Sequence, residues 1–181
     1  MDAFEQVIAG IFWNEGFWTQ TSLKVELTKE EKREIGRPSS PRWELDVVAY
    51  SGARNELYVI ECKSYLDSFG VQPRELEMTG GRGGRYKLFT EPDPLRRVVF
   101  HRLQRQLSEQ GFCQPDTAVH LALACGKVHG EDGLLRLREL AREGGWLLIE
   151  PSWIKERLLR SADASYENEI ASVVAKLLTR R

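Results

Sequence analysis

Three charged residues on two neighbouring apolar segments have the types and spacing that catalysis needs. Asp46 lies in the segment WELDVVAY, and Glu61 and Lys63 lie in the segment ELYVIECKSY. Side chains of a strand alternate between its two faces, so Glu61 and Lys63 are expected on one face, near Asp46 of the adjoining strand. Two carboxylates beside an ammonium are costly to bury and add little stability, which makes this cluster the first candidate for chemistry.

The chemistry that these groups could perform is hydrolysis of a phosphodiester. Hard divalent cations such as Mg²⁺ prefer oxygen ligands, so Asp46 and Glu61 could hold such an ion. Lys63 could orient or deprotonate the attacking water, or neutralise the negative charge that develops on the phosphate. The alternative is a structural salt bridge at the end of a strand.

A helix and three strands are predicted to position these residues. Apolar residues recur at helical spacing over residues 2–15 and leave Glu5 on a flank of the apolar stripe. Residues 19–28 alternate like an amphipathic strand. The charged stretch KEEKREIGRPSSP that follows is interpreted as an exposed loop.

Two central strands, residues 43–50 and 56–63, are predicted to form an antiparallel hairpin. Only the five residues of SGARN connect them, which is too short for a crossover between parallel strands. Their nearly continuous apolar runs favour positions inside a sheet over positions at its edge. The hairpin would bring Asp46 beside Glu61.

The remainder of the chain is predicted to alternate helices and strands. After a loop-rich insertion around residues 70–84, a helix over residues 94–110 is expected, with Asp93 as its N-cap. Further elements follow in this order: a buried strand at 117–125, a helix at 132–143, a strand at 146–150, a helix opening at Pro151 and an amphipathic helix at about 163–181. This order predicts one α/β domain over residues 1–181, a mixed sheet with helices on both faces.

Composition narrows the class of protein. The net charge of −1 argues against a generic, strongly basic nucleic-acid binder. The segment from Arg74 to Arg105, however, contains eight basic residues and only four acidic ones. That local excess could form a phosphate-facing patch or simply a solvated helix face. Three widely spaced cysteines predict a reduced, cytoplasmic protein without disulfides. No apolar run is long enough to cross a membrane, and the acidic N-terminus does not resemble a secretory signal.

The motif residues resemble those of the PD-(D/E)XK phosphodiesterase superfamily, whose fold is called restriction-endonuclease-like. The matching residues are Asp46 and the run Glu61-Cys62-Lys63, preceded by Glu5 in the first helix. The superfamily core, a helix, three antiparallel strands, a crossover helix and a further strand, is similar to about residues 1–125, with residues 126–181 as peripheral elaboration. Leu45 stands where the family motif has proline, a substitution that the family tolerates.

The resemblance implies a Mg²⁺- or Mn²⁺-dependent nuclease that cuts DNA in repair or defence. It implies Asp46, Glu61 and the backbone carbonyl of Cys62 as metal ligands, and Lys63 as the catalytic lysine. Glu5 would be an auxiliary acid for a second metal or a metal-bound water. Nucleases of this fold often form homodimers, for which the C-terminal helix is a candidate contact.

Other interpretations stay open at several positions. Glu5, in the first turn of a helix, is also explained by the helix macrodipole alone. Cys62 is expected to face away from Glu61 and Lys63 and to pack in the core. His120, inside an apolar strand, is interpreted as a core residue, and the glycines at 80–84 as a flexible loop. The alternative function is a non-catalytic module that keeps the fold and binds nucleic acid or protein.

Overall fold

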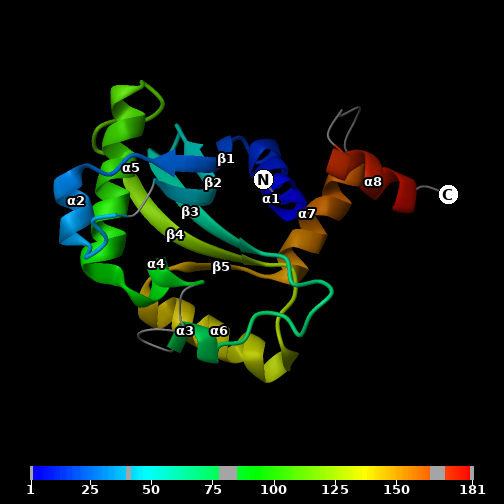
Figure 1. Cartoon of the computed structure of the whole chain (residues 1–181). Coiled ribbons are helices and arrows are strands. Elements are labelled where there is room, and N and C mark those ends of the chain that lie inside the picture. The colour runs from blue at the N-terminus through cyan, green and yellow to red at the C-terminus, as the bar shows by residue number, and fades with distance from the viewer. Residues whose placement is uncertain (1, 40–41, 78–84, 164–169, 180–181) are drawn as a thin grey trace.

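Five strands form a single mixed sheet in the order β1-β2-β3-β4-β5 (Figure 1). The computed structural model describes residues 2–39, 42–77, 85–163 and 170–179. The strands are β1 (Trp18–Val25), β2 (Trp43–Ser51), β3 (Glu56–Lys63), β4 (Ala118–Cys125) and β5 (Leu147–Ile149). β1, β2 and β3 are antiparallel neighbours, whereas β3, β4 and β5 run parallel. The predicted α/β class and the β2–β3 hairpin are therefore confirmed.

Helices cover both faces of the sheet, as predicted (Figure 1). On one face, α1 (Ala3–Asn14) and α7 (Pro151–Asp163) bury a set of apolar side chains that we call the α1 core. It includes Ile8, Phe12, Val47, Ile60 and Ile154. On the other face, α5 (Arg97–Glu109) and α6 (Gly130–Gly144) cover the α5 core. It includes Leu45, Val59, Val99, Leu103 and Leu137.

The C-terminal helix lies outside these two layers. α8 (Ile170–Thr179) packs against α7 and does not contact the sheet closely (Figure 1). Of the predicted helix over about 163–181, α8 covers residues 170–179, Asp163 is the end of α7, and residues 164–169 and 180–181 lie outside the described part. Among the described residues, no helix has the length and apolar character needed to span a membrane.

The predicted exposed loop after β1 is wrong, because its first half is the helix α2 (Lys29–Glu34). Thr28 and Glu31 form a capping box: Glu31 N–H donates to the Thr28 hydroxyl at 3.2 Å, and Thr28 N–H donates to the Glu31 carboxylate at 2.8 Å. This reciprocal pair satisfies backbone donors at the helix start. Burial of Ile35 at the other end fixes the helix against the α5 core.

The described part of the insertion between β3 and α5 contains three short helical segments. They are α3 (Arg74–Glu77), α4 (Lys87–Thr90) and η1 (Pro92–Arg96). The glycines predicted to form a flexible loop, residues 80–84, lie outside the described residues. α5 is bounded at Arg97, but the chain is already helical at Arg96, and Asp93 has the extended backbone angles of −136° and 130° that an N-cap residue adopts, which agrees with the predicted helix start at Pro94. The Asp93 carboxylate accepts a hydrogen bond from the Arg97 side chain at 2.7 Å.

A change of phase in β1 and β2 sets the position of Asp46. Val47 belongs to the α1 core and Leu45 to the α5 core, although residues two apart in a regular strand share a face. In β1, Ser22 has a φ of +50°, which is uncommon for a residue other than glycine. The register passes from Thr21 opposite Val47 to Leu23 opposite Leu45. In both strands, therefore, the side-chain alternation is interrupted at Ser22 and Asp46, and residues on either side of this point exchange faces of the sheet.

Candidate functional site

β2 and β3 stop pairing near Asp46. From there on, the Asp46 side chain, in place of a backbone carbonyl of β2, accepts a hydrogen bond from the backbone of β3. Regular pairing of the two strands runs from Ser51 opposite Glu56 to Val47 opposite Ile60. Beyond that point, the N–H of Cys62 donates to Asp46 Oδ2 at 2.8 Å. The carboxylate is thereby fixed between the diverging strands.

Glu61 and Lys63 lie on one face of β3 and contact each other, as their spacing predicts. The Lys63 ammonium forms an ion pair with Glu61 Oε1 and lies 3.4 Å from the carbonyl oxygen of Cys62. Both side chains are largely buried, with exposed fractions of 16% for Lys63 and 22% for Glu61. The expected cluster of Asp46, Glu61 and Lys63 is therefore present in the structure.

The charges in this cluster act strongly on Glu61. Burial raises the pKa of Glu61; the Lys63 ammonium opposes the rise, and the Asp46 and Glu5 carboxylates add to it. The pKa lies above its ordinary value, since burial and repulsion outweigh the ion pair. Glu5 thus acts on the same centre although it belongs to α1, on the other side of the sheet.

Lys63 is held in its charged form. Burial lowers the pKa of Lys63, but the charge and the hydrogen bond of Glu61 outweigh burial and raise it above its usual value. A lysine acts as a base only when its pKa is depressed. Of the three roles open to Lys63 from the sequence, removal of a proton is the one that its raised pKa disfavours.

Ser22 is a site residue that the sequence did not reveal. Its hydroxyl donates to Glu5 Oε2 at 3.4 Å, and its backbone lies opposite Asp46. Ser22 therefore links the first-turn acid of α1 to the strand pair that carries Asp46. Glu5 also lies in the first turn of α1, where the macrodipole favours an acid. Its position is therefore consistent both with an auxiliary acid of the site and with an acid that only stabilises the helix.

Tyr86 is a second such residue. Its side chain is only 1% exposed in the α5 core, and the Lys63 ammonium lies 5.8 Å from the centre of its ring. An ammonium over an aromatic face is attracted by the ring quadrupole. Tyr86 follows the glycine-rich insertion, so no local pattern connects it with β3.

Cys62 packs as predicted and does not act as a nucleophile. Its side chain contacts the α1 core, away from Lys63. Burial raises the pKa of the Cys62 thiol, and the carboxylates of Asp46, Glu5 and Glu61 raise it further. The thiol therefore stays protonated, whereas nucleophilic cysteines are thiolates. The three cysteines of the chain are all free, as expected.

The donor atoms of the cluster fit a hard divalent cation in their chemistry. Asp46, Glu61 and the Cys62 carbonyl offer only oxygen, which Mg²⁺ and Mn²⁺ prefer. The mutual repulsion of the carboxylates is also a strain that a cation would relieve. In the part of the chain that the structure describes, however, no group of three or more Asp, Glu, His or Cys side chains is already arranged as a metal-binding cluster.

The histidines lie apart from the cluster, and His120 corrects a prediction. Its side chain is 42% exposed rather than buried in the core, and its ring packs 5.1 Å from that of Tyr58. Its Nε2 atom lies 3.9 Å from Glu56 Oε1. The reason is its place near the start of β4, where the strand is only partly covered.

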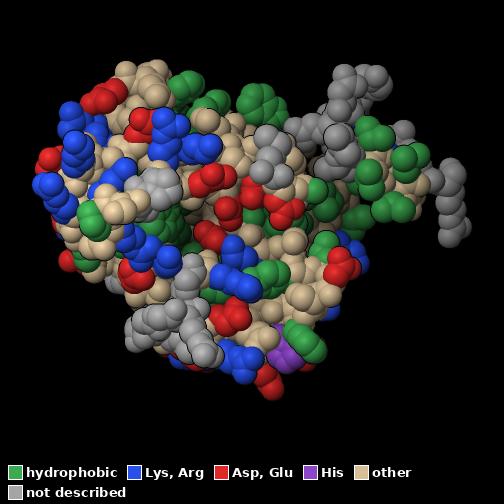
Figure 2. Space-filling view, in the orientation of Figure 1, with side chains coloured by type: hydrophobic (Ala, Val, Ile, Leu, Met, Phe, Trp, Pro, Cys, Tyr) green, Lys and Arg blue, Asp and Glu red, His purple; other side chains and the backbone are tan. Residues whose placement is uncertain are grey.

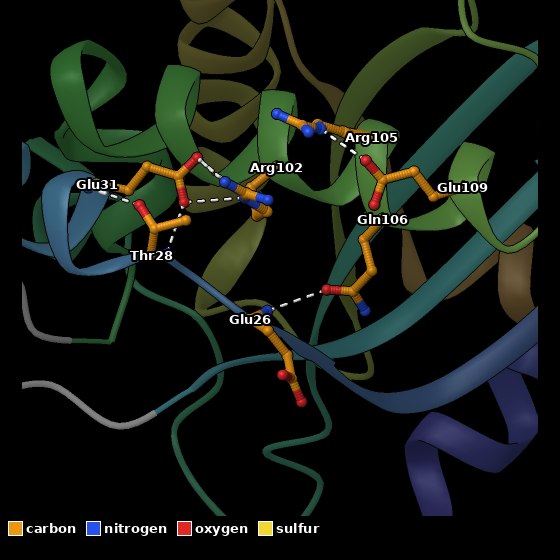
Figure 3. Close-up of polar contacts among 7 residues, drawn as sticks. All are labelled: Glu26, Thr28, Glu31, Arg102, Arg105, Gln106 and Glu109. Carbon is orange, nitrogen blue, oxygen red and sulfur yellow. Dashed lines mark hydrogen bonds and ion pairs between the residues drawn. The ribbon is translucent and has the colours of Figure 1, made fainter.

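Three arginines of the expected basic patch lie on α5 and are paired with acids. Arg102 forms two hydrogen bonds of 2.9 Å with the Glu31 carboxylate, and Gln106 accepts the N–H of Glu26 at 3.0 Å (Figure 3). Arg97 pairs with Asp93 and Glu34, and Arg105 pairs with Glu109. These three arginines hold α2 against α5 or pair with nearby acids, which favours the solvated-face interpretation for the α5 part of the predicted patch.

Acidic side chains gather in the middle of one face, near the N-terminus of α1, with Lys and Arg side chains beside and below them (Figure 2). No family model, curated protein or solved structure matches the chain. The resemblance found in the motif thus stays an expectation, and the function has to be inferred from the site.

Proposed function

We propose that the chain is a divalent-metal-dependent nuclease that hydrolyses DNA phosphodiester bonds, with a PD-(D/E)XK site on a restriction-endonuclease-like fold. One observation carries the proposal: the Glu61 carboxylate pairs with the largely buried Lys63 ammonium on β3, and the Asp46 carboxylate of β2 is fixed to the backbone of Cys62 between them. A fold does not need this arrangement, because buried ion pairs are weak stabilisers. It matches the demands of phosphodiester hydrolysis, which are a cation site and a group that neutralises the phosphate.

Each residue has a role in this proposal. Asp46, Glu61 and the Cys62 carbonyl would hold Mg²⁺ or Mn²⁺, and the Cys62 N–H orients the Asp46 carboxylate. The ion supplies charge neutralisation and makes a water more acidic. Glu5 would hold a water or a second ion and is oriented by the Ser22 hydroxyl.

Lys63 has a role that depends on its ion pair. In the structure its ammonium contacts Glu61. When the Glu61 carboxylate is engaged elsewhere, the ammonium is free to contact a phosphate oxygen and stabilise its growing negative charge. The ring of Tyr86 keeps the ammonium near this position.

The substrate, the cellular process and the oligomeric state of the proposed nuclease are inferred from the same resemblance to the PD-(D/E)XK superfamily. DNA is the substrate that it favours, in repair or defence, and three free cysteines suit the reducing cytoplasm. A homodimer would bring two sites to the two strands of a duplex. α8 exposes Leu177 and Leu178 beside an apolar groove of about 860 Å³ between α1, α7 and α8, where a second copy could pack.

A second candidate function is a non-catalytic module that binds nucleic acid or protein. It is favoured by the closed ion pair, in which Lys63 already neutralises Glu61. It is also favoured by the lack, among the described residues, of a ready-made cluster of metal ligands. In such a module the charged groups would only stabilise the parting of β2 and β3.

Cleavage assays separate the two functions. The wild type, Asp46→Asn and Lys63→Met are incubated with Mn²⁺ and single-stranded, duplex and branched DNA. The proposal expects cleavage by the wild type and a loss on the order of 10²-fold or more in Lys63→Met. Glu44→Gln is the matched control, since Glu44 is an exposed acid on the same strand as Asp46. Wild-type protein that cuts none of these DNAs supports the non-catalytic module.

A further inference from the structure

A shallow groove of about 480 Å³ is lined by Phe4 and Ser64, the sequence neighbours of Glu5 and Lys63 of the proposed catalytic site. One wall is the start of α1, and the other is the loop of residues 64–68, which follows Lys63 without a gap. Phe4 and Leu66 give it apolar and aromatic lining, Tyr65 also lines it while packing against the α5 core, and Asp2 and Asp67 add carboxylates. Its volume falls within the roughly 300–1,000 Å³ typical of small-molecule sites.

The loop that forms this wall is fixed to the segment after β4. The N–H of Val71 donates to the carbonyl of Lys127 at 2.9 Å, and the Lys127 ammonium donates to the carbonyl of Ser68 at 2.6 Å. Gly70 has a φ of +91°, and a Cβ there would lie 2.8 Å from the backbone carbon of Val128. Only glycine permits this approach, so the course of the loop is built into the fold.

Tyr65 is held in an unusual conformation at the mouth of the groove. Its φ is +44°, in the left-handed region that bulky residues rarely adopt. Its carbonyl accepts hydrogen bonds of 3.1 Å from both the N–H and the hydroxyl of Ser68, and its phenol accepts one of 3.3 Å from Arg85. Strain of this kind concentrates at functional sites, where the surroundings maintain it.

The same fixed loop exposes large apolar side chains to solvent. Leu66 is 62% exposed and Phe69 is 75% exposed. A loop whose course is set by so many contacts presents these side chains in one place, as expected of a surface that becomes covered in use.

Charge decides what kind of group fits the groove. The carboxylates of Asp2 and Asp67 repel a phosphate but accept hydrogen bonds from an uncharged ring. The cations of Lys127 and Arg85 bond to Ser68 and Tyr65 of the loop and can contact phosphates beside the groove. An apolar, aromatic groove with acceptors inside and cations around it matches a nucleobase with its flanking phosphates.

We propose that this groove binds an unpaired nucleobase next to the scissile phosphate. The inference rests on the proposed nuclease function and names its substrate: a strand with an unpaired nucleotide at the cut, as in single strands, flaps and branches. In an uninterrupted duplex, every base is stacked and paired, so none can enter the groove unless it is flipped out.

Binding measured without divalent ions tests the groove separately from catalysis. Fluorescence anisotropy compares a labelled single strand, its duplex and the same duplex with a single-stranded flap. Leu66→Ala is expected to weaken binding of the single strand and the flap roughly fivefold or more, and Leu66→Trp is expected to strengthen it. Leu135→Ala is the matched control, because Leu135 is 55% exposed on α6, outside the groove.

The outcomes separate the two proposals. Wild-type preference for the flap over the duplex, together with opposite effects of Leu66→Ala and Leu66→Trp, supports the base-binding groove even if no DNA is cut with Mn²⁺. In that case the nuclease proposal alone fails. Equal binding of duplex and flap overturns the groove proposal, and so does unchanged binding by both Leu66 variants, the result expected if a protein covers the loop.

Discussion

The carboxylate of Asp46 accepts the backbone N–H of Cys62 at 2.8 Å, where the pairing of β2 and β3 has ended. One oxygen of Asp46 therefore holds the two strands together while the strands themselves diverge. The same bond places Asp46 beside Glu61, the neighbour of Cys62 in sequence. The Asp46 side chain therefore contributes both to the stability of the fold and to the proposed catalysis. Variants of Asp46 can separate these two contributions.

Asp46→Ala and Asp46→Asn are both predicted to lose DNA cleavage, but only Asp46→Ala is predicted to lose stability. Alanine leaves the Cys62 N–H without its acceptor, which costs about 1–3 kcal/mol of unfolding free energy. Asparagine keeps a carbonyl oxygen at that place and so retains most of the stability, but it removes the charge that a cation needs. Denaturant unfolding measures the first effect and DNA cleavage the second. Full cleavage by Asp46→Asn would contradict the assigned role.

Divalent cations are predicted to stabilise the folded protein. At a concentration a hundredfold above Kd, a ligand that binds only the folded state adds about 2.7 kcal/mol. For a chain of this size, this raises Tm by about 5–10 °C. Thermal unfolding with Mg²⁺ or Mn²⁺ measures the shift, which EDTA should reverse. Asp46→Asn should lose the shift and Glu44→Gln should keep it; an equal shift in both variants places the ion elsewhere.

Ser22 is predicted to influence activity through Glu5. Ser22→Ala and Ser22→Gly both remove the hydroxyl that donates to Glu5, a bond with a net value of about 0.5–1.5 kcal/mol. Cleavage should fall by a similar modest factor in both variants. Glycine also relieves the backbone strain at a φ of +50°, so only Ser22→Gly should match or exceed the wild type in stability. Restored activity in Ser22→Thr would identify the hydroxyl as the cause.

Local patterns were sufficient to predict the hairpin and the proximity of Asp46, Glu61 and Lys63. The short connection between the strands fixed their direction, and alternation along β3 placed Glu61 and Lys63 together. The capping box of α2 was also present in the sequence as Thr28 and Glu31, but the high charge of the segment favoured a loop.

Other parts of the site depend on tertiary structure and have no local signal. Ser22 adopts a left-handed conformation that serine rarely takes, so the interrupted side-chain alternation of β1 and β2 could not be predicted from residue types. Tyr86 reaches Lys63 from beyond an insertion whose course is set by packing. The pairing of the α5 arginines required the position of α2.

The ion pair of Glu31 and Arg102 is predicted to make stability depend on pH. Burial raises the pKa of Glu31, but hydrogen bonds from Arg102 and from the backbone N–H of Thr28 outweigh it and lower the pKa below its usual value of 4.5. The stabilisation is therefore complete above pH 4.5 and is lost as the pH falls through the lowered pKa of the folded state. Glu31→Gln should reduce stability at neutral pH and flatten its decline in acid, as measured by unfolding in denaturant from pH 7 to pH 3. Glu109→Gln, which breaks the exposed pair with Arg105, should leave that decline unchanged. An equal decline in the wild type and Glu31→Gln would assign the acid sensitivity to other carboxylates.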